Sequence, residues 1–283
     1  MSILKRCYDV ASYIYGQGNS PFWNNRFAWL RKIIKNTLEI AKLPVAQDAS
    51  ILDLGCGTGI ASEEFLKLHP QTKEIIGVDL SSKMGERAKK NLNSRFSFRN
   101  NDYTEKALWQ DWSERFQGIL AFYTFHWIPR RKYSEIIQLI HRALVNKGWL
   151  IGVAMGSKDV GGIFDDLIDE LLHIYLTPLE VAKVLDQWNP KEVSEIEKVL
   201  HENDFSYSRI TSLRYNTLVK RFNDLLSIIL YQYSFWLSGL DPILFPSIRA
   251  KLIQFIKNDS RFYDDCDRIQ VPHHLVIFEA HKS

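Results

Sequence analysis

The 283-residue sequence has only three cysteines, Cys7, Cys56 and Cys266, an odd number spread far apart along the chain. No two of them stand at the C-x-x-C spacing of a metal site, so we expect no bound metal. A scattered, odd set also does not suggest a disulfide framework and is typical of a reducing compartment. The N-terminus lacks the apolar core of a signal peptide. We therefore expect a cytoplasmic protein.

Long hydrophobic runs and a strong charge bias are missing as well. The most apolar segment, residues 225–237, contains Gln232 and is too short to cross a bilayer. The net charge of +3 is too small to indicate nucleic-acid binding, for which a clustered basic face is expected. The sequence thus predicts no integral membrane segment and no nucleic-acid partner, and leaves the oligomeric state open.

Aromatic residues, by contrast, are abundant, with 8 Trp, 12 Tyr and 16 Phe. Most of them must serve the core, but a pocket for an apolar small molecule needs the same residue types. The chain is long enough for one large domain, or for one domain with an insertion.

The most informative stretch is residues 51–59, Ile-Leu-Asp-Leu-Gly-Cys-Gly-Thr-Gly, an apolar run followed by three alternate glycines. A glycine-rich turn between a strand and a helix forms a cradle for a nucleotide. The third glycine comes one residue earlier than in the dinucleotide fingerprint, where Ile60 stands instead. Asp53 would repel a pyrophosphate but attract the ammonium and sulfonium of S-adenosylmethionine. The loop therefore favours S-adenosylmethionine over NAD, the alternative being a glycine turn without a ligand.

A second acid supports a nucleotide. The next apolar run, residues 75–78, ends in Asp79, a position and spacing that suit hydrogen bonds to ribose hydroxyls.

The chain alternates between strand-like and helix-like segments from residue 51 to residue 155, which indicates a parallel sheet covered on both faces. We predict strands at 51–54, 75–78, 96–98, 118–125 and 149–155, and helices at 25–43, 60–69, 81–93 and 131–145. Beyond residue 158 we predict a helix-rich stretch at 163–203, strands at 206–215 and 274–280, and helices at 222–237 and 247–257. Ligands of such sheets bind beyond the carboxyl ends of the strands, where Asp53, Asp79, Asp102 and residues 122–127 fall.

The glycine stretch, the segment 77–81 with Met84, and Asn101-Asp102 together resemble the class I S-adenosylmethionine-dependent methyltransferases over residues 45–155. The resemblance implies a Rossmann-like α/β fold: a mostly parallel seven-stranded sheet, helices on both faces and a helical cap. It implies three parts: a helical substrate gate at 1–44, the cofactor-binding core at 45–157, and at 158–283 cap insertions with the last strands. Before the fifth strand, residues 146–148 keep one glycine of the family's Pro-Gly-Gly turn.

In this family the glycine loop and first acid hold the methionine part of the cofactor. The second acid holds the ribose, and a third, matched by Asp102, faces the adenine amino group, although a surface turn also explains this position. The candidate cofactor-binding residues are Asp53, Gly55, Cys56, Gly57, Gly59, Asp79, Leu80, Asp102, Tyr103 and Phe122.

Residues 121–128, Ala-Phe-Tyr-Thr-Phe-His-Trp-Ile, are similar to the matching segment of juvenile hormone acid and trans-aconitate carboxyl methyltransferases, as are residues 271–280. In that group a tryptophan after the fourth strand and a glutamine near the N-terminus hold the substrate carboxylate. Trp127 matches the first, and Gln17 matches the second by position alone.

The resemblance therefore predicts an enzyme that methylates the carboxylate of a small-molecule acid. A carboxylate is already a nucleophile and needs only donors, such as the indole of Trp127, to orient it. His126 is a candidate base for a hydroxyl or amine acceptor, or a packed residue bonded to the backbone. A carrier-protein-bound acid as acceptor and a non-catalytic cofactor-binding protein remain alternatives. A nucleic-acid base methyltransferase is disfavoured because the Asn/Asp-Pro-Pro-aromatic turn is missing.

Overall fold

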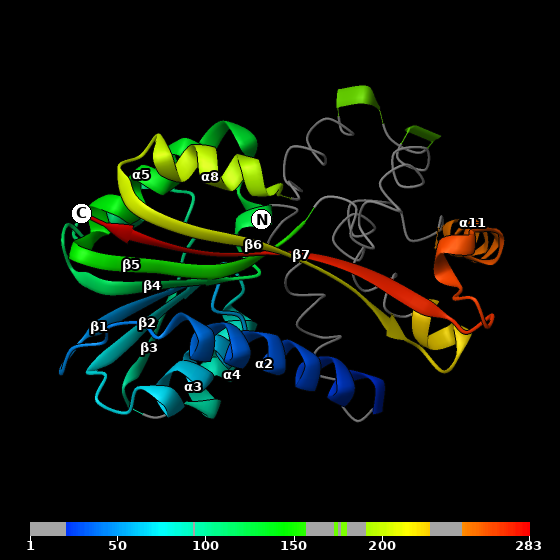
Figure 1. The fold of residues 1–283 in the computed structure, drawn as a ribbon, viewed down its shortest axis with the longest axis horizontal. Coiled ribbons are helices and arrows are strands. Elements are labelled where there is room, and N and C mark those ends of the chain that lie inside the picture. The colour runs from blue at the N-terminus through cyan, green and yellow to red at the C-terminus, as the bar shows by residue number, and fades with distance from the viewer. Residues whose placement is uncertain (1–20, 93, 157–172, 175–176, 180–190, 227–244) are drawn as a thin grey trace.

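The protein is described from a computed structural model, which describes residues 21–92, 94–156, 173–174, 177–179, 191–226 and 245–283. Its centre is a seven-stranded sheet in the order β3-β2-β1-β4-β5-β7-β6 (Figure 1). The first five strands in this order are parallel, and β7 runs antiparallel to both β5 and β6. The predicted mostly parallel, seven-stranded sheet is thus confirmed.

The strands are β1 (Ser50–Leu54), β2 (Glu74–Asp79), β3 (Phe96–Asn100), β4 (Phe116–Phe122), β5 (Leu144–Met155), β6 (Phe205–Leu218) and β7 (Gln270–Lys282). The α-helices are α2 (Pro21–Ala41), α3 (Ile60–Leu68), α4 (Ser82–Asn91), α5 (Tyr133–Ala143), α8 (Val193–His201) and α11 (Phe245–Asn258). The 3₁₀ turns are η1 (Lys106–Trp109), η2 (Phe125–Trp127), η3 (Arg130–Lys132) and η5 (Ser260–Phe262).

Helices cover both faces of the sheet, as the unbroken apolar runs in β1 and β2 require. In Figure 1, α5 and α8 lie on one face, and α2, α3 and α4 lie on the other. Ile136 of α5 and Leu200 of α8 share a core cluster with Leu52, whereas Leu38 of α2 and Phe65 of α3 pack in a second cluster. β6 and β7 run beyond the rest of the sheet toward α11 (Figure 1).

Local signals account for most element boundaries. The predicted cap of α4 is present, because the Ser81 hydroxyl accepts a hydrogen bond from the Met84 N–H at 3.3 Å. The predicted strand at 206–215 and helix at 247–257 are present but longer, as β6 and α11. Of the helix predicted at 222–237, residues 222–226 are helical, and the remainder lies outside the described residues. Most of the helix-rich stretch predicted before α8 lies outside them too.

Three boundaries around β4 and β5 differ from the prediction. β4 ends at Phe122 rather than at residue 125, because Tyr123 adopts a left-handed φ of 58° that breaks the extended chain. α5 begins at Tyr133, after a 3₁₀ turn, rather than at residue 131. β5 begins at Leu144, so the helix predicted to reach residue 145 ends two residues earlier.

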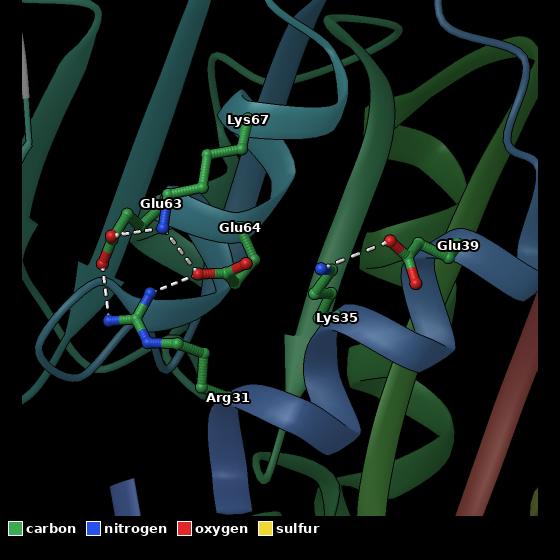
Figure 2. A network of polar contacts seen from close by, with 6 residues as sticks. All are labelled: Arg31, Lys35, Glu39, Glu63, Glu64 and Lys67. Atoms are coloured by element: carbon green, nitrogen blue, oxygen red, sulfur yellow. Dashed lines mark hydrogen bonds and ion pairs between the residues drawn. The ribbon is translucent and has the colours of Figure 1, made fainter. Parts of the chain in front are cut away.

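A polar network holds α2 against α3 (Figure 2). The Arg31 guanidinium pairs with Glu63 at 2.8 Å and also contacts Glu64, whose side chain is almost completely buried. Lys67 pairs with the same two carboxylates at 2.7 and 2.8 Å. Because α3 follows the glycine loop directly, this network ties the N-terminal helix to the element that carries the loop.

We expect Arg31→Met to lower the free energy of unfolding by about 1–2 kcal/mol, because it leaves the buried Glu64 with Lys67 alone. Burial raises the pKa of Glu63, but hydrogen bonds from Arg31 and Lys67 outweigh it and leave that pKa lowered. The contribution of these ion pairs to the free energy of unfolding is therefore fully present above the pKa of the unfolded glutamate, about 4.3. It is lost as the pH falls through the lowered pKa of the folded state.

Urea unfolding at pH 7 and at pH 3.5 measures both effects. The control is Lys35→Met, which removes an exposed pair with Glu39 at 3.7 Å and should cost at most about 0.5 kcal/mol. Equal losses in the two variants would show that the network does not stabilise the α2–α3 contact.

Among the helices of the described ranges, none has both the length and the apolarity needed to cross a membrane.

Candidate active site

The glycine loop joins β1 to α3 at the edge where the parallel strands end, called here the carboxyl edge. Gly55, Gly57 and Gly59 have φ values of 65°, 52° and 83°, a region that favours glycine. A Cβ on Gly55 would lie 2.6 Å from Thr124 Oγ1, and one on Gly59 would lie 2.7 Å from the Leu92 side chain. A Cβ on Gly57 would meet nothing within 4 Å. The middle of the loop is therefore an open cradle between two closely packed ends.

The carboxyl end of β4 is locked under this loop. The Thr124 hydroxyl is buried and donates to the backbone carbonyl of Leu54 at 2.7 Å. No signal in the sequence distinguishes Thr124, which lies inside the strand predicted at 118–125. The contact fixes the residues that follow β4 beside the cradle.

Asp53 lies beneath the loop and is 1 % exposed. Its Oδ2 accepts a hydrogen bond from the Ser62 hydroxyl of α3 at 2.6 Å. Burial raises the pKa of Asp53 to about 7, although the Ser62 bond lowers it, and the charge of Asp79 raises it further. Asp53 therefore titrates near neutral pH when no cation is beside it.

Asp79, the last residue of β2, contacts the same loop. Its two carboxylate oxygens accept hydrogen bonds from the Gly57 N–H at 2.9 Å and the Ser81 N–H at 2.8 Å. Burial raises the pKa of Asp79 to about 6, against the effect of these two bonds. Each oxygen keeps a lone pair for a further donor, such as a ribose hydroxyl.

The remaining candidates come from the ends of β2, β3 and β4. Asp102 is half-buried and accepts a hydrogen bond from the Thr104 N–H at 2.8 Å. The buried Tyr103 donates to the Thr124 carbonyl at 3.4 Å. Asn100, the last residue of β3, donates to the carbonyls of Asp79 and Leu80 at 3.0 and 2.9 Å. These bonds hold the ends of β2 and β3 together.

Cys56 and Phe122 are both buried and belong to the core cluster on the α2, α3 and α4 face. Burial raises the pKa of the Cys56 thiol well above its usual value, and the charges of Asp79 and Asp53 act in the same direction. The thiol is therefore not poised as a nucleophile. The structure thus brings the described cofactor candidates to one edge of the sheet.

After β4 the chain turns through Tyr123 into η2, which carries His126 and Trp127. His126 is 2 % exposed, and its Nδ1 accepts a hydrogen bond from the Met155 N–H at 3.2 Å. Burial lowers the pKa of His126 to about 3, and the charge of Lys191 adds to this effect. The imidazole is therefore neutral at physiological pH, and Nδ1 is already in use.

Trp127 is half-buried, and its ring centroid lies 5.3 Å from that of His126. Its backbone N–H donates to the Thr124 carbonyl at 2.9 Å, which fixes the turn. Gln17, the other candidate for the substrate carboxylate, lies outside the described residues.

An aromatic cluster from distant segments lies beside the end of β4. The ring centroids of Trp29 and His273 are 5.1 Å apart, and those of Tyr215 and His273 are 4.9 Å apart. Trp29 also approaches Tyr123, with 6.5 Å between centroids. β7 pairs with β5 through Leu275 and Met155, so His273 projects past the carboxyl edge. This aromatic cluster could not be predicted from the sequence, because its four rings come from segments that are far apart in the chain.

Within the described ranges, no group of three or more histidine, cysteine or acidic side chains is arranged to hold a metal ion. The donor set fits S-adenosylmethionine better than a metal or a dinucleotide. The open side of Gly57 lets a ligand approach the backbone of the loop. The buried acids Asp53 and Asp79 would repel a diphosphate there.

Comparison with known proteins shows which class of protein the chain is similar to. Residues 51–148 match the family model of a methyltransferase domain. The chain is 30% identical over 149 residues to malonyl-[acyl-carrier protein] O-methyltransferase of Halalkalibacterium halodurans, covering 48% of this chain and 54% of that protein. It is 26% identical over 161 residues to juvenile hormone acid O-methyltransferase of Bombyx mori, covering 55% of this chain and 56% of that protein.

Among solved structures, a candidate methyltransferase from Bacillus halodurans has the same fold. It superimposes with a TM-score of 0.59 at 15% identity, over 88% of this chain and 98% of that one. Fold, loop and family match together define a class I methyltransferase domain. Residues 51–148 are thus similar to methyltransferase domains, and the described chain has the fold of a solved methyltransferase structure. It spans about half the length of the curated relatives that it matches.

Proposed function

We propose that this protein transfers the methyl group of S-adenosylmethionine to a carboxylate of a small-molecule acid. The observation that carries the proposal is that His126, next to Trp127, is a neutral imidazole whose Nδ1 already accepts a hydrogen bond. A hydroxyl or amine acceptor must lose a proton, and His126, the histidine next to Trp127, is buried, neutral and bonded to Met155. A carboxylate acceptor needs no base, and only its orientation has to be fixed.

The chain's own residues supply position and a dry environment. Asp79 holds the ribose hydroxyls, Asp53 faces the cationic methionine end, and the open side of Gly57 lets the ligand approach the backbone. When bound, the cofactor supplies the electrophilic methyl group. Trp127 donates its indole N–H to the carboxylate oxygen that does not react, and Gln17 stays a proposed second donor. Asp102, Tyr103, Leu80 and Phe122 enclose the adenine in this proposal.

The aromatic cluster around His273 supports an acceptor with an apolar body. Stacked rings at the carboxyl edge bury apolar surface without demanding hydrogen bonds. Two of the curated relatives are named as O-methyltransferases, one of malonyl-[acyl-carrier protein] and one of juvenile hormone acid, which supports an acid as acceptor. A cytoplasmic location stays a prediction from the cysteine content.

The proposal is tested with a panel of small carboxylic acids, methyl-labelled S-adenosylmethionine and mass spectrometry of the products. A labelled methyl ester is the expected product. Labelled amines or ethers from matched amine and hydroxyl compounds, with no ester, would replace the carboxylate by another acceptor. Binding of the cofactor without any transfer would favour a non-catalytic cofactor-binding protein.

A further inference from the structure

A fully buried lysine lies at the carboxyl end of β5. Lys191 is 1 % exposed, and its backbone forms a bridge with Gly156 and donates to the Met155 carbonyl at 2.9 Å. Met155 in turn donates its N–H to His126, so Lys191 and His126 are attached to the same residue. Lysines are almost never buried to this degree unless an anion balances their charge.

No such anion contacts Lys191 within the described part of the chain. Its ammonium lies 3.8 Å from the centroid of the Tyr133 ring and makes neither a hydrogen bond nor an ion pair with a described residue. The hydroxyl of Tyr133 is likewise buried and has no hydrogen-bond partner among the described residues. Both groups can donate, and one anionic oxygen between them would accept from both.

The surrounding charges do not fill this need. Glu195 of α8 is the carboxylate that acts on Lys191, but it does so from beyond ion-pair distance and already accepts the Glu192 N–H at 3.0 Å. Arg130 repels the ammonium, and His126 is neutral. Burial lowers the pKa of Lys191 to about 7, which an approaching anion would reverse.

The pairing of Met155 shows which part of an acceptor would reach this point. Met155 bonds His126 through its N–H and Lys191 through its carbonyl, so both residues lie on the side of β5 that faces β4. Lys191 is therefore a neighbour of η2, the turn that carries Trp127. An ammonium bound to the reacting group itself would weaken that group as a nucleophile.

We propose that Lys191 and the Tyr133 hydroxyl form a subsite for a second, non-reacting carboxylate of the methyl acceptor, so that the acceptor is a dicarboxylic acid. This inference rests on the proposed function, carboxylate methylation. The second carboxylate accepts charge-assisted hydrogen bonds from both groups and balances the buried charge.

The test is calorimetric binding in the presence of S-adenosylhomocysteine, with dicarboxylates from succinate to sebacate and monocarboxylates of equal length. We expect the wild type to bind the best dicarboxylate at least about 10-fold more tightly than its monocarboxylate, as one charge-assisted bond provides. Lys191→Met should reduce this preference to about 1–2-fold, and Lys191→Arg should restore part of it. Lys198→Met, on the exposed face of α8, is the control and should keep the wild-type preference.

Tyr133→Phe keeps the ring under the ammonium and removes only the hydroxyl, so it tests the subsite even if Lys191→Met does not fold. It should lower the preference by about 3–10-fold without lowering Tm, because the lost hydroxyl has no described partner. A wild type that binds no dicarboxylate or shows no preference would overturn the inference. So would a preference that survives both Lys191→Met and Tyr133→Phe.

The same materials separate this inference from the proposed function. Methyl ester formation that shows no dependence on a second carboxylate leaves the function in place and removes the subsite. Tight dicarboxylate binding without ester formation from any acid keeps the subsite and removes the function.

Discussion

Replacing Asp53 with asparagine is expected to stabilise the ligand-free protein at pH 8 by about 2–4 kcal/mol, while weakening its affinity for S-adenosylmethionine. Burial raises the pKa of this carboxyl from 3.8 to about 7. An acid whose folded-state pKa is raised stabilises the protein below its unfolded pKa. That contribution is lost as the pH rises through about 7. The wild type therefore bears the cost of a buried charge at pH 8 that the amide does not.

Urea unfolding between pH 4 and pH 8 measures this prediction. The stability difference between Asp53→Asn and wild type should be near zero at pH 4 and grow toward pH 8. The exposed Asp265→Asn variant is the control and should show no such growth. A difference that stays constant with pH would mean that Asp53 is not held as a buried acid.

The same variant also tests the charge argument for the cofactor. Because S-adenosylhomocysteine lacks the sulfonium charge, Asp53→Asn should weaken binding of S-adenosylmethionine more than binding of S-adenosylhomocysteine. Equal losses for the two ligands would show that Asp53 supports the loop without attracting the cation. The result would then place the selectivity for the cofactor elsewhere in the site.

Trp127→Phe is expected to lower kcat/KM for methylation of the acid by about 10–100-fold, the worth of one donor to a charged oxygen. The phenyl ring preserves most of the apolar packing next to His126, and only the indole N–H is lost. Affinity for S-adenosylhomocysteine should remain within about 2-fold of wild type, because Trp127 is assigned to the acceptor and not to the cofactor. A change of about 2-fold corresponds to well under the roughly 1.4 kcal/mol of a tenfold change.

Steady-state kinetics with the acid found in the labelled-methyl screen, together with calorimetry of cofactor binding, measures these two quantities. Trp109→Phe is a poor control because that ring is fully buried in the core. Tyr263→Phe, at the end of η5, is the suitable comparison and should keep wild-type kinetics. Unchanged kcat/KM in Trp127→Phe would remove Trp127 from the acceptor site.

The cofactor half of the site was predictable because it depends on local sequence. Three alternate glycines after an apolar run require a turn with positive φ, and an acid closing the next run falls at the end of the neighbouring strand. Asp53 and Asp79 accordingly lie at one edge, where Asp79 accepts the Gly57 N–H of the loop and Asp53 accepts the Ser62 hydroxyl of α3. The Ser81 cap was predictable for the same reason.

The acceptor half was not predictable, because its residues are brought together only by tertiary packing. Tyr123 ends β4 in a left-handed conformation. The position holds neither glycine nor asparagine, the residues from which such a conformation could be predicted. The burial of Lys191 depends on a bridge to Gly156 and on the Tyr133 ring from α5, which no sequence spacing encodes. The contact of Trp29 with His273 joins nearly opposite ends of the chain.

The raised pKa values of Asp53 and Asp79 could not be predicted from the sequence either, because they depend on burial in the folded protein. Asp53 was predicted as an anion that attracts a cation, and Asp79 as an acceptor for ribose hydroxyls. In the ligand-free protein, burial raises the pKa of both carboxyls. Cofactor binding should then release protons between about pH 6 and 7. The attraction for a cation and the cost of the empty site thus have the same origin, the burial of two acids under one loop.

The central claim is that the cradle formed by the glycine loop, Asp53 and Asp79 accepts a cationic sulfur nucleoside and rejects a dinucleotide. Isothermal titration calorimetry of the purified chain with S-adenosylmethionine and with NAD tests it most directly. We predict saturable binding of S-adenosylmethionine and no detectable heat of binding with NAD. Binding of NAD with no binding of S-adenosylmethionine would contradict the account.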